Sequence, residues 1–455
     1  MEAFSSFLGT LNGFVWGPWM LTFLVGTGVY LTLRLGFLQF RTLKYALKLA
    51  FSPSKQDRSS KGDISHFQAL MTALAATIGT GNIVGVATAV VLGGPGAVFW
   101  MWITAIFGMA TKYGEAVLSI KYRITDENGE MAGGPMYYIE RGLGCKWLAW
   151  LFALFGAVAA FGIGNLVQVN SVAGAVHDTF GISPWITGLT LAGFTALVIL
   201  GGVQSIGKAT GVMVPFMAVF YILGGLYIIF TNLSLVPDAL ALIFTQAFTA
   251  EAGFGALIGT TIRYGVARGV FSNEAGLGSA PIAAAAAKTD HPCRQGLVSM
   301  TGTFLDTIVV CSITGISVVM ANLYTGLDKA QAAALTSRSF EFFIPHLGSL
   351  IVTVALVLFA YSTVLGWSYY GEKCFYYLVG EKGLKPYRIV FSISAFFGAI
   401  LKLSLVWDIA DTFNGAMAIP NLIALVLLSG VIVAETKDFQ KLRAREKAEE
   451  LEGAA

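Results

Sequence analysis

The stretch 66–92, HFQALMTALAATIGTGNIVGVATAVVL, is apolar and long enough to span a membrane, yet Gly79-Thr80-Gly81-Asn82 interrupts it near its centre. Glycine costs about 1 kcal/mol of helix stability relative to alanine. Backbone groups freed from a helix in lipid must find partners inside the protein. In secondary transporters those partners are the substrate and the coupling ion. The interruption therefore predicts a binding site at mid-membrane depth.

A second apolar stretch repeats this arrangement. Residues 256–287 read ALIGTTIRYGVARGVFSNEAGLGSAPIAAAAA, and the polar, glycine-containing run 271–278 interrupts them. One interruption can arise by chance, whereas two, one in each half of the chain, indicate a shared function.

The composition is that of a polytopic membrane protein. Hydrophobic residues make up 56% and charged residues 12% of the 455, with a mean hydropathy of +0.71, whereas soluble domains carry about 25% charged residues. The net charge of +3 is too small to indicate a nucleic-acid partner. The N-terminus lacks a basic region and a cleavage site, so we expect no removable signal peptide.

The hydropathy pattern predicts an all-α integral membrane protein with eleven transmembrane helices. They are expected near residues 12–37, 66–92, 96–120, 147–176, 183–203, 209–231, 254–287, 296–322, 347–371, 389–406 and 409–434. With the N-terminus outside and the C-terminus in the cytoplasm, the inside loops, tail and adjoining helix ends hold 23 of the 29 Lys and Arg residues. The excess of basic residues on cytoplasmic loops supports this orientation.

The interrupted segments are the second and seventh spans, which lie five spans apart. Because five is an odd number, the two segments cross the membrane in opposite directions. Spans 2–6 are therefore expected to be inverted relative to spans 7–11, a 5+5 repeat with its site at the repeat interface. We expect an extra N-terminal helix and a cytoplasmic basic loop over 1–65. The two repeats then occupy 66–232 and 233–434, and a charged cytoplasmic tail covers 435–455.

Several motifs resemble one transporter family. The block 93–102, GGPGAVFWMW, followed by ITAIFG, is similar to the signature of the sodium:alanine (alanine or glycine:cation) symporter family. The blocks IGTGNIVGVATA, GEMAGGPMYYIERGLG and GVARGVFSNEAGLGSAP resemble it as well, so the resemblance covers essentially the whole chain. It implies a leucine-transporter-like fold and uptake of small neutral amino acids with a cation.

A zwitterionic amino acid needs donors for its carboxylate and acceptors for its ammonium. The N–H groups of Thr80, Gly81 and Asn82 begin the second half of span 2, and a helix N-terminus favours an anion. We assign them, with Gly79, to the substrate carboxylate; the alternative is a glycine-lined helix crossing.

The second interruption is expected to hold the ammonium. Its proposed acceptors are carbonyls around Phe271 and the amide oxygen of Asn273, with Gly276 in the same substrate site. The neighbouring Glu274 has three open roles: a counter-charge, a proton site, or a capping partner of the following helix, the last of which we favour.

Two further spans supply candidate substrate contacts. Gln168 shares a helix face with Asn165 on span 4 and either points into the cavity or bonds a neighbouring helix. Trp367 on span 9 can wall the pocket, leaving room for glycine or alanine, or simply pack.

The resemblance implies a sodium site. In leucine-transporter-like proteins one sodium ion lies between the span 2 interruption and a pair of hydroxyls on span 9. Ser362 and Thr363 match that pair, and the carbonyls of Ala75 and Ile78 would complete the site. The alternative is back-bonding of these hydroxyls to their own helix.

Other ionisable residues lie within the predicted spans and are candidates by default. Asp306 can join Asn82 and Ser272 in a second cation site, carry a proton, or serve structure. Lys112 and Glu115 are interpreted as a structural pair. Five residues near the outer ends form either an external gate or a solvated rim: Arg263, Arg268, Lys402, Asp408 and Asp411.

The sequence thus predicts a plasma-membrane symporter, not an enzyme, that couples small neutral amino acids (alanine, glycine) to Na⁺ by alternating access. Sodium would be the coupling ion rather than a prosthetic group, the lipid bilayer is a further expected partner, and no nucleic acid is expected to bind. A proton-coupled amino-acid symporter is the main alternative. A channel would need a continuous polar pore, and an enzyme would need a catalytic cluster inside the membrane.

Overall fold

The computed structural model describes residues 2–52, 59–248, 259–401 and 404–452. The described chain is almost entirely helical. Its one small sheet pairs β1 (Ile124–Thr125) with β2 (Met131–Ala132) in antiparallel register, Ile124 opposite Ala132.

The first half of the chain contains these helices: α1 (Glu2–Val15), α2 (Pro18–Arg34), α3 (Leu38–Phe51), α4 (His66–Thr77), α5 (Val86–Gly93), α6 (Gly96–Tyr122), α7 (Pro135–Leu143), α8 (Lys146–Phe161), α9 (Val167–Phe180), α10 (Pro184–Ile199), α11 (Gly202–Thr231) and α12 (Val236–Gln246). The second half contains α13 (Thr260–Asn273), α14 (Ala280–Ala285), α15 (Pro292–Thr303), α16 (Ser312–Ala321), α17 (Lys329–Ala332), α18 (Leu335–Phe343), α19 (Gly348–Val379), α20 (Leu384–Ile400), α21 (Ser404–Ala416), α22 (Ala418–Leu427) and α23 (Ser429–Glu452). Short π-helical segments lie at Gly81–Gly85, Gly162–Leu166 and Phe304–Cys311, and 3-10 turns at Leu233–Leu235 and Glu381–Gly383.

Six helices of the described chain are long and apolar enough to cross a membrane, and seven if one bent pair counts as a single span. The bent pair is His66–Thr77 with Gly81–Gly93, and it includes the first interruption that the sequence predicts. The protein is therefore a multi-pass membrane protein.

Four of the eleven predicted spans do not meet this criterion: 96–120, 183–203, 254–287 and 389–406. Helix α6 carries Lys112 and Glu115 within its length, and α10 has only 16 residues. Residues 254–258 and 402–403 lie outside the described chain. The count of eleven stays a prediction.

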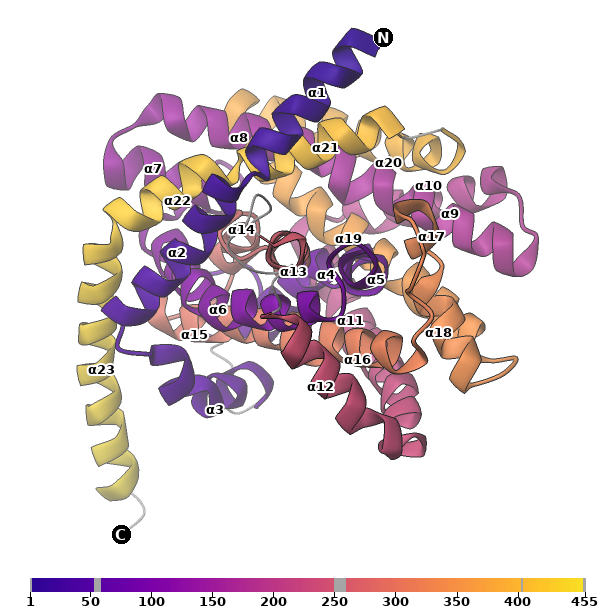
Figure 1. Cartoon of the computed structure of the whole chain (residues 1–455). Coiled ribbons are helices and arrows are strands. Elements are labelled where there is room, and N and C mark those ends of the chain that lie inside the picture. Colours follow the sequence, from indigo (N-terminus) through magenta and orange to yellow (C-terminus); the bar gives the residue numbers. More distant parts are fainter. Residues whose placement is uncertain (1, 53–58, 249–258, 402–403, 453–455) are drawn as a thin grey trace.

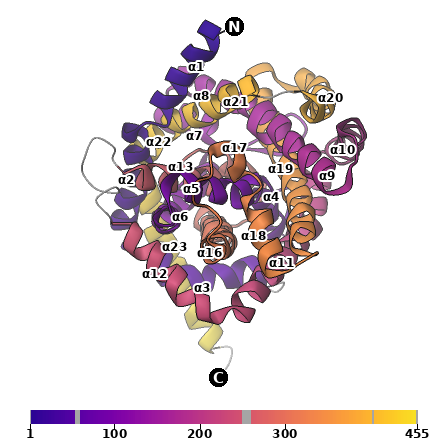
Figure 2. The ribbon, with the colours of Figure 1, turned by 45° about the vertical axis from the view of Figure 1, so that its right-hand side comes forward.

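The interrupted helices lie at the centre of the molecule. In two views that differ by 45°, α4, α5 and α13 occupy the middle, while α9, α10, α12 and α20 lie at the periphery (Figures 1 and 2). The two termini lie at opposite ends in both views. Many peripheral apolar side chains are exposed, including Leu197 and Val212 at 75% and 76%, as expected for surfaces that contact lipid.

Local sequence signals account for several helix boundaries. Ser65 caps α4 in a capping box with Gln68, because each side chain accepts from the other residue's backbone N–H. Proline opens α2, α7, α10 and α15, where its missing N–H costs nothing.

One predicted loop proved to be partly helical. The basic segment expected at 38–65 contains the 14-residue helix α3. Its buried residues recur at the three- and four-residue spacing of one helix face, as in Ala46, Leu49 and Ala50. The sequence-based prediction did not use this pattern.

Candidate functional site

The first interruption separates α4 from the π-helical segment Gly81–Gly85 with a bend of 53°. Ile78 is extended there (φ −76°, ψ 93°) and ends α4. A methyl group on Gly79 would lie 2.5 Å from Oγ1 of Thr363. Glycine at this position therefore permits α19 to approach the unwound backbone.

The freed N–H groups of this interruption meet side-chain oxygens. Gly79 N donates to Oδ1 of Asn82 at 2.9 Å, and Thr80 N donates to Oε1 of Gln168 over a long 3.4 Å. Gln168 Nε2 in turn donates to the carbonyl of Ile163, at the π-helical break between α8 and α9. The interruption is thus held by amides rather than by helix bonds.

The second interruption follows α13. Glu274 ends that helix in the left-handed region (φ 55°), and the backbone of Gly276 and Gly278 is left-handed as well (φ 92° and 84°). A non-glycine residue in this conformation is uncommon and marks functional sites more often than chance. Helix α14 begins only at Ala280.

Buried carboxylates hold this second unwound segment. Glu115 Oε1 on α6 accepts the N–H groups of Gly276 and Gly278, both at 3.1 Å, and the amide of Asn421 at 2.6 Å. The interpretation of Glu115 as the pair of Lys112 is wrong, because no ion pair within 4 Å joins them and Glu115 binds backbone instead. Glu115 positions the unwound segment between α13 and α14.

Glu274 links the second interruption to α19. Its Oε2 accepts the hydroxyl of Ser279 at 2.6 Å, and its Oε1 accepts the indole N–H of Trp367 at 2.9 Å. The side chain is buried, 3% exposed, and lies in the wall of a cavity between the two interruptions.

That central cavity has a volume of about 10 Å³, which is room for about one water molecule. Seven of the predicted site residues line it: Gly79, Thr80, Gly81, Gln168, Phe271, Thr363 and Trp367. The other lining residues are Ala76, Thr77, Ile163, Glu274 and Asn414. Residues from five separate parts of the chain therefore meet at one point.

Three predicted substrate residues do not line this cavity. Asn82 turns its amide to Oδ1 of Asp306 at 2.7 Å. The amide oxygen of Asn273 accepts the backbone N–H of Ala275. The backbone of Gly276 donates to Glu115 and accepts from Asn421. In this arrangement their contribution is to shape the interruptions.

Sequence reasoning did not single out Asn414, which reaches the cavity from α21. It is buried and its Oδ1 has no hydrogen-bond partner in the described chain. An amide within the apolar segment 409–434, which holds only one other, Asn421, was the available signal. Ile163 and Ala76 carry no such signal, because apolar residues of this kind occur throughout the chain.

The predicted sodium ligands lie together beside the first interruption. Ser362 Oγ is 3.2 Å from the carbonyl of Ala75 and 3.4 Å from that of Ile78, and Thr363 Oγ1 is 3.4 Å from the latter. Both hydroxyls also lie within 3.0 Å of the carbonyl of Phe359 on their own helix. Neutral oxygens gathered in this way suit a hard cation.

A second polar cluster surrounds Asp306 in the π-helical segment Phe304–Cys311. Its carboxylate accepts from Asn82, Ser272 (2.8 Å) and Thr307 (2.7 Å), and it is fully buried. Asp306 thus joins the two interruptions through Asn82 and Ser272. Among the described residues, no three His, Cys, Asp or Glu side chains gather as a metal-binding group.

Two further cavities lie against the central one. A cavity of about 170 Å³ shares Phe271 with it and is also lined by Arg263, Arg268, Asp408 and Asp411. The predicted outer cluster therefore meets at one cavity, although Lys402 lies outside the described residues. A cavity of about 10 Å³ shares Thr77 with the central one and contains Lys112.

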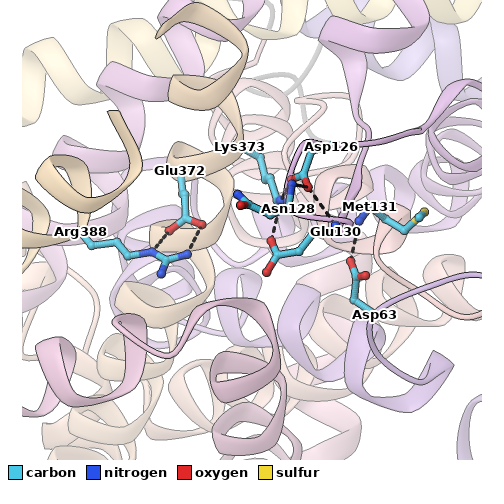
Figure 3. Close-up of polar contacts among 8 residues, drawn as sticks. All are labelled: Asp63, Asp126, Asn128, Glu130, Met131, Glu372, Lys373 and Arg388. Carbon is cyan, nitrogen blue, oxygen red and sulfur yellow. Dashed lines mark hydrogen bonds and ion pairs between the residues drawn. The ribbon is translucent and has the colours of Figure 1, made fainter. Parts of the chain in front are cut away.

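A charged cluster ties α19 to the β1–β2 hairpin (Figure 3). The ammonium of Lys373 lies 3.1 Å from Asp126 and 3.0 Å from Glu130. The side chains of Lys373 and Asp126 are almost fully buried, 2% and 1% exposed. The hairpin also connects to the segment before α4, since Met131 N donates to Asp63 at 2.8 Å; burial raises the pKa of Asp63.

A multi-pass helical protein whose two interrupted helices enclose a small polar cavity has the features of a membrane transporter. The sodium:alanine symporter family matches residues 1–453, and the chain belongs to that family, whose members are transporters and not enzymes. The resemblance that the motifs predicted is confirmed.

Relatives in the family carry related names. The sodium/alanine symporter AgcS of Methanococcus maripaludis is 68% identical, over 97% of this chain and 99% of its own. A putative sodium/proton-dependent alanine carrier of Bacillus subtilis is 38% identical, over 96% and 93%. A probable sodium/glutamine symporter of the same organism is 39% identical, over 95% and 90%.

Proposed function

We propose that this protein carries alanine and glycine into the cell together with Na⁺ by alternating access. The observation that carries the proposal is the central cavity, where unwound backbone, the buried carboxylate of Glu274 and the hydroxyl of Thr363 converge. Family membership supports cation-coupled amino-acid symport.

The substrate would bind between the two interruptions. Its carboxylate would face the N–H groups of Thr80 and Gly81, displacing the long bond to Gln168. Its ammonium would face the Oε atoms of Glu274, each of which accepts one bond from the protein and retains capacity for another. We therefore shift the ammonium site from Asn273 to Glu274.

Trp367 would limit the size of the substrate. Its indole lies in the cavity wall, fixed by Glu274 and packed on Gly164, and the cavity holds only about 10 Å³. A small side chain such as that of alanine fits this restriction, and even alanine requires the walls to move apart.

Sodium would bind at the carbonyls of Ala75 and Ile78 and the hydroxyls of Ser362 and Thr363. Oxygen ligands of an ion of this size stand about 2.3–2.6 Å from it. Two ligands that subtend a right angle at the ion therefore lie roughly 3.5 Å from each other. The hydroxyl and carbonyl oxygens of this site are 3.2–3.4 Å apart, which is close to that distance. The ion would couple α19 to the first interruption.

The architecture proposed for transport is eleven spans in a 5+5 inverted repeat, with repeats at 66–232 and 233–434, an extra helix in 1–65 and a tail at 435–455. Two cavities meet the central one through different residues: the cavity of about 170 Å³ shares Phe271 with it, and a cavity of about 10 Å³ shares Thr77 with it. We assign the first to the outside and the second to the inside. Spans 2, 3, 7 and 8 would rock against the rest.

The charged cluster around Lys373 would close the cytoplasmic side. It joins α19 to the hairpin after α6, and Arg123 extends the contact to the carbonyls of Ala285 and Ala287. These contacts bring together loops that the distribution of basic residues predicts to share the cytoplasmic side, with the N-terminus outside. Maleimide labelling of Lys382→Cys in inside-out but not right-side-out vesicles tests this orientation.

Proton coupling is the second candidate, and Asp306 favours it, because a fully buried carboxylate is costly to keep charged and can therefore take up a proton. Reconstituted protein separates the two: alanine uptake should require a sodium gradient at fixed pH and stop when potassium replaces sodium. Uptake driven by a pH gradient without sodium would reject the sodium assignment. Competition by glycine and glutamine would define the substrate range.

A further inference from the structure

Helix α3 presents one exposed stripe that has aromatic side chains at its two ends and basic side chains between them. Phe40, Lys44, Lys48 and Phe51 recur at spacings of three and four residues, so they share a face with Arg41 and the preceding Phe37. The phenylalanines at 37, 40 and 51 are 48%, 58% and 48% exposed. Exposed phenylalanines beside long basic side chains suit a membrane surface, where rings enter the acyl boundary and the basic side chains reach the headgroups.

A large groove lies beside this stripe, between α3, α23 and the start of α15. Its volume is about 570 Å³, and we call it the α3–α23 groove. It is lined by Tyr45, Lys48, Arg294, Arg443, Glu446, Lys447 and Glu449. In both views α3 and α23 lie close together (Figures 1 and 2), and the guanidinium of Arg443 stacks 3.4 Å from the ring centre of Tyr45.

The groove has an excess of positive charge. Arg294 is neutralised by Asp290 and Glu446, at 2.7 Å each. Lys48, Arg443 and Lys447 have no ion-pair partner within the described part of the chain. The groove lining therefore carries four basic side chains (Lys48, Arg294, Arg443 and Lys447) against two acidic ones (Glu446 and Glu449).

We propose that the α3–α23 groove binds the headgroup of an anionic phospholipid. The phosphodiester would meet Lys48, Arg443 and Lys447, while the acyl chains would leave along the phenylalanines of α3. The exposed aromatic rings near the groove favour a lipid over a soluble phosphate, because a lipid has acyl chains that can pack against the rings and a soluble phosphate has none. The bound lipid would fasten α3 to α23, and the site is separate from the transport cavity.

Native mass spectrometry of the full chain in detergent tests this site with phosphatidylglycerol, against phosphatidylcholine as the neutral lipid. The variant is Lys48→Glu with Lys447→Glu, both exposed and with no side-chain hydrogen bond or ion pair in the described part of the chain. The control is Lys382→Glu with Lys385→Glu, exposed lysines outside the groove that change the net charge equally. Size-exclusion profiles and thermal midpoints establish that both variants fold.

The wild type and the control should retain one phosphatidylglycerol in preference to phosphatidylcholine. The groove variant should bind it about 25-fold more weakly, a factor of about five for each cation removed. Equal binding by groove and control variants, or no preference for the anionic lipid, would overturn the site. Displacement of the lipid by soluble glycerol phosphate at equal concentration would overturn the assignment to lipid.

Discussion

The indole N–H of Trp367 donates a 2.9 Å hydrogen bond to Oε1 of Glu274 and so joins α19 to the second interruption. Both side chains are buried and line the central cavity. Because Thr363, one turn earlier on α19, lies against Gly79 of the first interruption, this one helix contacts both. A change at either interruption therefore reaches the other through α19.

Glu274→Gln should reduce alanine uptake by about tenfold or more. Glutamine offers one acceptor oxygen where Ser279 and Trp367 each need one, and leaving a buried donor unsatisfied costs about 1–3 kcal/mol. Initial rates in proteoliposomes measure the effect. Glu140→Gln, at a carboxylate that accepts from Tyr377 outside the cavity, is the control. An uptake rate of Glu274→Gln equal to that of the wild type would show that the Glu274 carboxylate does not bind the substrate.

Gly164→Ala should weaken alanine uptake several-fold, because the added methyl would lie 2.3 Å from Cβ of Trp367 and push the indole into the cavity. Gly174→Ala on α9 is the matched control, since nothing lies within 4 Å of its added methyl. The measurement is the KM for alanine. Equal KM values for the two variants would show that the position of Trp367 does not limit binding.

Thr363→Val and Ser362→Ala should raise the sodium concentration for half-maximal uptake by about tenfold, since each removes one oxygen ligand and tenfold corresponds to 1.4 kcal/mol. The control is Ser394→Ala, whose hydroxyl bonds only the carbonyl of Val390 on an exposed helix face. Sodium titration of uptake at saturating alanine measures the shift. An unchanged sodium dependence in both variants would place the ion elsewhere.

Lys373→Met should destabilise the protein by about 3–5 kcal/mol, because it leaves the buried Asp126 without its cation. Lys121→Met is the control: its pair with Glu435 is exposed, 43% at the lysine, and should contribute no more than about 1 kcal/mol. Thermal midpoints of the purified variants in detergent give the comparison. Similar midpoints would mean that water reaches the Lys373 cluster.

Much of this site is visible in the sequence. Helix interruption in an apolar stretch is a local property, so the breaks at Gly79–Asn82 and after Asn273 follow from glycine and polar residues alone. The pairing of Ser362 and Thr363 with the carbonyls of Ala75 and Ile78 was expected from the resemblance, and the structure places these atoms together. Their role as sodium ligands stays a prediction.

The direction of each side chain was decided by tertiary packing. Asn82 and Asn273 look like substrate ligands in the sequence. In the structure Asn82 donates to the carboxylate of Asp306, 224 residues away, and Asn273 accepts the backbone N–H of Ala275 in the unwound segment. Glu115, three residues after Lys112, pairs with N–H groups 161 and 163 residues away.

The sequence by itself determined the membrane class, the two interruptions and the family, since hydropathy, glycine placement and motifs are properties of contiguous residues. Only the tertiary structure decided that Glu274 rather than Asn273 faces the cavity, that Asn414 joins it, and that α3 and α23 enclose a basic groove. Those outcomes depend on contacts between segments hundreds of residues apart, which local spacing does not encode.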